Sequence, residues 1–180
     1  SLPKELEKDI EKIVSVIRVP ISVRSSSLLE DSHFQPFAGV YQTSMIPNSG
    51  DDEKRRKDLE NAIKTVWAST YFEGAREYLK RTGHSMEEEK MAVIIQQVTG
   101  SDHDGLWFPN ISGVARSLDY YPAGSRKAED GIGMLAFGMG KTIVDEGAAF
   151  RFCPARPQVP VSSLTGRSSS QRYFYALDRN

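Results

Sequence analysis

Residues 23–31 have the sequence VRSSSLLED, and FAGVYQT follows at residues 37–43. From Ile21 to Ser26 apolar and polar side chains alternate, which is the period of a half-buried strand. Such a strand delivers an arginine and three hydroxyls to its end, and Gly39 then allows close backbone approach to a ligand. Guanidinium, hydroxyl and backbone groups in this order suit a polyphosphate.

A purely structural interpretation of the same stretch stays open. In this alternative, Arg24 forms an ion pair with Glu30 or Asp31, and the serines only shape a turn. The residues alone do not separate the two interpretations.

The segments around this stretch predict a mixed α and β organisation. Apolar residues at spacings of three and four predict helices over residues 3–17, 51–67 and 73–81. The apolar, β-branched run 91–98 predicts a buried strand. Further strands are expected over residues 105–108, 113–121 and 132–137. Helices interleaved with strands and glycine-rich loops predict an α+β fold.

Charge and cysteine content exclude several classes of partner. Lys plus Arg number 23 against 24 Asp plus Glu, so no net field favours nucleic acid or an anionic membrane. Apolar runs fall short of the roughly 18 residues needed for a membrane span. The single cysteine, Cys153, has no internal disulfide partner. We therefore expect a cytoplasmic protein with neither nucleic acid nor membrane as its partner.

Four segments resemble a known family. The stretch 23–43 resembles the "VRSS…ED…FAG" signature of the pyruvate- and ATP-binding domain of phosphoenolpyruvate synthases and pyruvate phosphate dikinases. MAVIIQQV at residues 91–98 looks like that family's "MAVxxQxMV" strand, and GLWF at 105–108 looks like its "GVxF" strand. GMGKTIVD at 138–145 resembles its "GLGExVVxG" turn. The resemblance covers residues 18–157, most of the chain.

The resemblance implies a partial ATP-grasp-like domain, a mainly antiparallel sheet with flanking helices. It implies that Arg24 contacts ATP phosphates as a catalytic residue and that a loop through Gly39 closes over them. The strand at 96–98 would lie at the adenine, and we expect it to face Arg24 across a cleft. The expected nucleotide-binding residues are Arg24, Ser25, Gly39, Gln96, Gln97, Val98 and Lys141.

The glycine turn departs from the family pattern. Lys141 stands where the family usually has Glu, and the acid that typically precedes the turn falls near Met134, which cannot hold Mg²⁺. Asp145 or Glu146 is the alternative ligand, and Asp145 is the predicted one. Glu129 and Asp130 are expected to lie in a solvated loop rather than to bind the metal ion. The Gly-Lys-Thr ending lacks the earlier glycine of a phosphate-binding P-loop, which leaves a tight turn with Lys141 near a phosphate.

Other candidate groups favour structural roles. The isolated histidines are expected on the surface and Cys153 in the interior. Trp107, Phe108, Tyr120 and Tyr121 could stack on a base, but core packing is the favoured interpretation. The charged run 54–57 is expected to be a solvated face.

The sequence therefore predicts a nucleotide-binding domain over residues 1–157 and a linker or extended arm over 158–180. The implied cofactors are ATP and Mg²⁺. In the full-length protein, the resemblance implies phosphoryl transfer from ATP to a histidine on a separate phosphohistidine domain and then to pyruvate. A non-catalytic regulatory module and a structural domain without nucleotide binding are the alternatives.

Overall fold

The computed structural model describes residues 2–27, 30, 39–85, 87–122, 124–146, 149–158 and 171–180. They form two compact units, Ser1–Val98 with Arg179–Asn180 as unit 1 and Thr99–Asp178 as unit 2. The described strands form three sheets of three strands each, and all neighbouring strands are antiparallel. The predicted α+β class with a mainly antiparallel sheet is confirmed.

The sheet of unit 1 has the strand order β2-β1-β3, built from Thr43–Ile46, Ile21–Ser27 and Met91–Gln97. The central strand β1 pairs through Ile21 with Ile46 on one side and with Gln97 on the other. Among the described residues, β3 pairs with β1 alone and is therefore an edge strand.

Three helices of unit 1 begin and end where local signals predict. The first, α1 (Lys4–Val16), starts directly after Pro3, and α2 (Asp52–Ser69) starts after Asp51, whose carboxylate accepts a hydrogen bond from the Lys54 amide at 2.7 Å. The third, α3 (Glu73–Thr82), ends at Gly83, which has a left-handed φ of 75°. In the described part of the chain, each helix is too short or too polar to cross a membrane.

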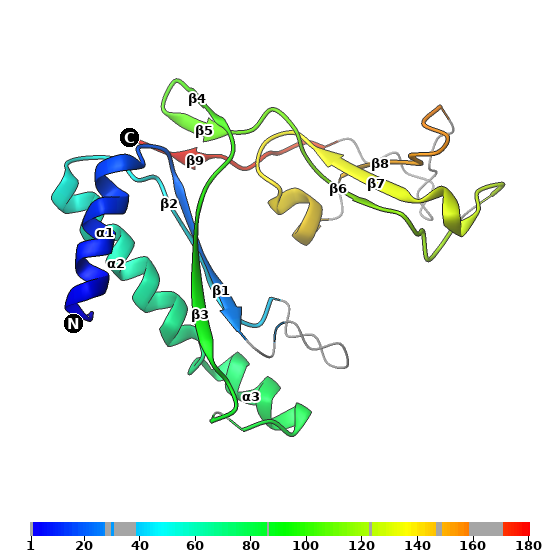
Figure 1. Cartoon of the computed structure of the whole chain (residues 1–180). Coiled ribbons are helices and arrows are strands. Elements are labelled where there is room, and N and C mark those ends of the chain that lie inside the picture. The colour runs from blue at the N-terminus through cyan, green and yellow to red at the C-terminus, as the bar shows by residue number, and fades with distance from the viewer. Residues whose placement is uncertain are drawn as a thin grey trace. The chain divides into compact units, whose positions relative to one another are not determined.

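The core of unit 1 lies between the sheet and two helices, and Figure 1 shows α1 and α2 beside β1 and β3. Alternate residues of β1 point into it, and the helices contribute one apolar stripe each. Its buried members include Ile10, Val14, Ile21, Val23, Ile46, Leu59, Ile63 and Val66.

Two predictions about which residues of unit 1 are buried were wrong. The strand β3 was expected to be buried, but its residues alternate between half-buried and exposed, because only one face meets the helices. The charged run 54–57 was expected to be solvated, but the Arg55 side chain is buried, with 1% of the residue exposed.

Unit 2 contains two small sheets. One has the order β4-β5-β9, from Ser101–His103, Leu106–Phe108 and Leu177–Asp178, and the other has the order β6-β7-β8, from Ser112–Arg116, Ile132–Ala136 and Phe150–Phe152. A 3₁₀ turn, η1 (Ala128–Asp130), precedes β7, and a π-helical turn, η2 (Thr142–Glu146), follows it. The expected burial of Cys153, Trp107 and Phe108 is confirmed, whereas Tyr120 and Tyr121 are exposed, and the prediction that they pack in a core was wrong.

Candidate functional site

Arg24 and Gln96 lie side by side on neighbouring strands of unit 1. Arg24 is opposite Ile94, and Gln96 is opposite Ser22, so Arg24 and Gln96 are diagonal neighbours on the same face of the sheet. The guanidinium Nη1 of Arg24 donates a hydrogen bond to Gln96 Oε1 at 3.4 Å, and both residues are exposed. The two groups thus share one surface rather than facing each other across a cleft.

This surface is the face of the sheet that points away from the helices, and we call it the open face. Strand alternation and register place on it residues of all three strands: Thr43, Met45, Ser22, Arg24, Ser26, Ala92, Ile94 and Gln96. Met45 and Ile94 are exposed apolar side chains. The buried hydroxyl of Ser22 has no hydrogen-bond partner among the described residues. The open face therefore combines a cation, apolar surface and one unsatisfied polar group.

The structure shows the hydrogen bonds that Glu30 makes with the serine stretch. Glu30 accepts hydrogen bonds from Ser25 Oγ at 2.8 Å and from the Ser27 amide at 2.9 Å, and its own amide donates to Ser27 Oγ at 3.1 Å. Glu30 is thus used by the serines, whereas the hydrogen bond shown for Arg24 goes to Gln96. Asp31 lies outside the described residues. Ser25 points to the face opposite Arg24, so its hydroxyl serves the turn.

In the strand predicted to lie at the adenine, successive residues direct their backbone N–H and C=O groups to opposite sides. The Val98 amide donates to the Pro20 carbonyl at 2.8 Å, which makes this a hydrogen-bonded pair of the antiparallel ladder. By alternation, Gln96 and Ile94 also direct their backbone groups toward β1. The N–H and C=O of Gln97 point to the outer edge of β3 instead. Among residues 96–98, Gln97 is therefore the one whose backbone N–H and C=O face a ligand approaching that edge.

Gly39 stands where the chain re-enters the described structure, with a left-handed φ of 79° that favours glycine. Next to it, the buried Tyr41 donates its hydroxyl proton to Glu89 Oε2, just before β3. Burial, and then the hydrogen bond and negative charge of Glu89, raise the pKa of Tyr41 well above its usual 10.0. Tyr41 thus anchors the end of the predicted phosphate-covering loop, whose residues 31–38 lie outside the described part.

The remaining predicted residues belong to unit 2. Lys141 precedes η2, and its Nζ lies 5.0 Å from the centre of the Tyr175 ring. Asp145 lies in η2, but its side chain is not among those described. Among the described residues, no three His, Cys, Asp or Glu side chains gather closely enough to hold a metal ion. The carboxylates with described side chains therefore do not form a Mg²⁺ site by themselves.

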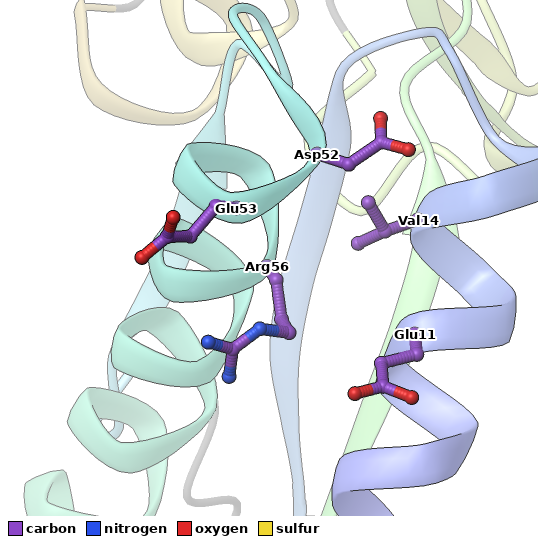
Figure 2. A pocket seen from close by; sticks show the side chains of 5 residues that line it. All are labelled: Glu11, Val14, Asp52, Glu53 and Arg56. Carbon is purple, nitrogen blue, oxygen red and sulfur yellow. The ribbon is translucent and has the colours of Figure 1, made fainter.

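A hollow of about 270 Å³ lies between α1 and α2, but its chemistry does not suit a nucleotide. Figure 2 shows its lining side chains, Glu11, Val14, Asp52, Glu53 and Arg56. Three carboxylates would repel a triphosphate, and the one cation, Arg56, already pairs with Glu60. The hollow contains none of the predicted site residues.

The sequence prediction missed one neighbour of a site residue. Tyr175 lies 34 residues beyond Lys141 in a segment predicted to be a linker or arm, and it contacts Lys141 only because the described end of that segment docks on unit 2. A contact between segments so far apart leaves no signal in residue spacing.

The antiparallel α+β fold agrees with a partial ATP-grasp-like domain. Residues 1–171 match the family described as "Pyruvate phosphate dikinase, AMP/ATP-binding domain", and the chain belongs to this family.

Three curated proteins are similar to parts of the chain. They are the prodigiosin synthesizing transferase PigC of Serratia marcescens (38% identical over 88 residues), a phosphoenolpyruvate synthase of Aeropyrum pernix (29% over 96) and the uncharacterized phosphotransferase YvkC of Bacillus subtilis (28% over 107). The alignments cover 49%, 53% and 59% of this chain, but only 9%, 11% and 12% of the respective relatives. The chain thus corresponds to a small part of proteins that include phosphotransferases.

Proposed function

We propose that the open face of unit 1 binds ATP, with Arg24 contacting phosphate oxygens. The observation that carries this proposal is the exposed guanidinium beside Gln96 in a chain of an AMP/ATP-binding family. Gln96 takes one of the five N–H donors of Arg24, and the described residues show no carboxylate paired with it. Charge-assisted, bidentate contacts to phosphate are the strongest hydrogen bonds that this group makes.

The base would lie along the outer edge of β3. The backbone N–H and C=O of Gln97 give the donor and acceptor pair that an adenine edge requires. Gln97 is three residues from Ile94, the partner of Arg24, which is about 10 Å of extended strand. This spacing suits an extended nucleotide with its base and phosphates at different positions.

In the full-length protein, the proposed reaction is phosphoryl transfer from ATP to a histidine on a separate domain and then to pyruvate. The similarity to a phosphoenolpyruvate synthase supports this assignment. Mg²⁺ belongs to the same proposal, with Asp145 as its ligand and charge neutralisation of the phosphates as its contribution. This chain's own part is to bind and orient the nucleotide.

A non-catalytic regulatory ATP-binding module is the second candidate. It is favoured by Lys141 at the family's usual Glu position and by Met134, which is half-buried in β7 opposite Val114 and Arg151. Pyruvate-dependent AMP formation by the full-length protein separates the candidates, because the regulatory module would bind ATP without forming AMP.

Calorimetric titration of the 180-residue chain with ATP tests the proposed site. Arg24→Ala should weaken binding by about 1.5–3 kcal/mol, roughly 10- to 150-fold, because a charge-assisted contact is lost. Arg24→Lys should recover only part of this loss, because an ammonium lacks the planar fork.

Arg116→Ala is the matched control, because it removes an equally exposed arginine from a strand of unit 2. It should leave the affinity for ATP unchanged. Equal affinities for the wild type and Arg24→Ala would remove Arg24 from the site.

A further inference from the structure

We propose that residues 171–178 form a strap that holds the glycine turn 137–141, and that Tyr175 within it is a positioning residue for Lys141. The strap ends in β9, which pairs Leu177 with Trp107 and Asp178 with Leu106. Residues 172–178 lie beyond the part of the chain that matches the family, so the strap adds to the assigned domain.

Gln171 fixes the start of the strap to the start of the turn. Its Oε1 accepts a hydrogen bond from the Phe137 amide at 2.8 Å, and its Nε2 donates to the Phe137 carbonyl at 2.9 Å. The same Nε2 donates to the Tyr173 carbonyl at 2.8 Å. One side-chain amide therefore satisfies both backbone groups of Phe137 and also orders the strap itself.

The middle of the strap crosses the turn at Gly138. The Met139 amide donates to the Tyr175 carbonyl at 2.9 Å, and on the other side Ser112 Oγ donates to the Gly138 carbonyl at 2.6 Å. A Cβ on Gly138 would lie 2.9 Å from both Phe174 Cδ2 and the Tyr175 carbonyl, closer than packed atoms allow. Only glycine lets the strap lie this close to the turn.

An aromatic cluster supports the crossing. The Phe174 ring lies 5.1 Å from the ring of Phe108 and 4.9 Å from that of Phe137, within the range of favourable aromatic pairs. The strap is thus held at both ends and in the middle by contacts of different kinds.

The strap also positions Lys141, and this inference rests on the proposed contact of Lys141 with a phosphate. The Tyr175 ring holds Lys141 Nζ at 5.0 Å from its centre, which orders a flexible four-carbon side chain before a ligand binds. Tyr175 therefore acts through Lys141, without touching the ligand.

Hydrogen–deuterium exchange of the full chain tests the strap without any ligand. Gln171→Ala should speed exchange of the Phe137 and Met139 amides on the order of tenfold, because Phe137 loses its acceptor and the detached strap takes the Tyr175 carbonyl away from Met139. Tyr173→Ala is the control, since 77% of this residue is exposed and its described contact uses the backbone carbonyl. Unchanged exchange in Gln171→Ala would overturn the strap.

A second pair of variants tests the strap through a substitution in the glycine turn. Gly138→Ala should speed exchange in residues 172–178 because the new methyl displaces Phe174 and Tyr175. Gly124→Ala also substitutes a glycine with positive φ but meets no atom within 4 Å, and it should leave that exchange unchanged. If both glycine variants behave alike, the close approach at Gly138 does not matter and the strap is refuted.

Titration with inorganic tripolyphosphate tests the positioning of Lys141. Tyr175→Leu should weaken binding about two- to fivefold, Tyr175→Phe should retain wild-type affinity, and Tyr175→Leu should have no effect in a Lys141→Ala background. Loss of affinity in Tyr175→Phe, or an undiminished Tyr175→Leu effect without Lys141, would overturn the positioning role. Unchanged affinity in Lys141→Ala would instead refute the proposed phosphate contact, and the exchange data would still report on the strap alone.

Discussion

Arg55 shows at the scale of one residue how unit 1 fixes the start of the strand that carries Arg24. Its Nη2 donates to the carbonyls of Val14 and Ile17 at the end of α1, and its Nε donates to Asn48 Oδ1 at 3.1 Å. The Asn48 amide in turn donates to the carbonyls of Ile17 and Val19 at 2.9 and 2.8 Å. One buried guanidinium thus satisfies carbonyls that the end of a helix leaves without partners.

Arg55→Met should lower the free energy of unfolding by about 3–5 kcal/mol, because buried carbonyls and Asn48 lose their donor. The measurement is urea unfolding followed by circular dichroism at a helix wavelength. Arg56→Met is the matched control: it removes the neighbouring arginine, which pairs with Glu60 near the surface, and should cost less than about 1 kcal/mol. Equal losses in the two variants would contradict the role of Arg55.

The raised pKa of Tyr41 predicts that the folded state loses stability in alkaline solution. Its pKa is raised in the folded state, so the stability that it contributes is fully present below pH 10.0 and is lost as pH rises further. Between pH 9 and 11 the wild type should lose up to about 1.4 kcal/mol per pH unit more than Tyr41→Phe. Urea unfolding at both pH values measures this difference.

Tyr71→Phe is the control for this pH dependence, because 71% of Tyr71 is exposed and its replacement should leave the slope of the wild type unchanged. A wild type and a Tyr41→Phe variant with the same slope above pH 10 would show that the Tyr41 proton is not held by the fold.

At the scale of elements, residue spacing predicted the helices of unit 1 and the strands β1, β3, β5 and β7 within a few residues. Caps and periodicity are local, so the sequence contains them. The hairpin of β4 and β5 was missed, although Asp104-Gly105 carries its signal: both have positive φ, as a two-residue turn requires. The two-residue strand β9 has no such signal, because it exists only through its pairing with β5.

The burial of β3 could not be predicted from its apolar composition. A continuous apolar run is typical of a strand covered on both faces, but β3 is an edge strand with one covered face. Sequence spacing also could not show that Ser25 bonds to Glu30 while Arg24 reaches Gln96, because strand register and turn geometry decide these contacts.

Gln97→Pro tests the outer edge of β3 as the base-binding element. Proline removes the outward N–H and the exposed side chain of this residue but no N–H of the β1–β3 ladder, which edge strands tolerate. The affinity for ATP should fall about 2- to 12-fold, the value of one hydrogen bond, while the affinity for inorganic tripolyphosphate should not change. An equal loss for both ligands in calorimetry would exclude recognition of the base at this edge.

At the scale of the whole molecule, the family assignment and the open face support each other. Unit 1 supplies Arg24, Gln96 and the outer edge of β3, whereas Lys141 and the strap belong to unit 2. Each unit can therefore be tested for its own contribution to binding. The alignments span only 9–12% of the relatives' length, so the activity of a full-length protein is part of the proposal.

A titration of the ¹⁵N-labelled chain with ATP, followed by amide chemical shifts, tests directly whether the open face of unit 1 binds the nucleotide. The open face predicts that the largest changes fall on β1 and β3, at Arg24, Gln96 and Gln97, and that Arg24→Ala reduces them at equal ATP concentration. Changes confined to the acidic hollow between α1 and α2, or no changes at saturating ATP, would contradict it.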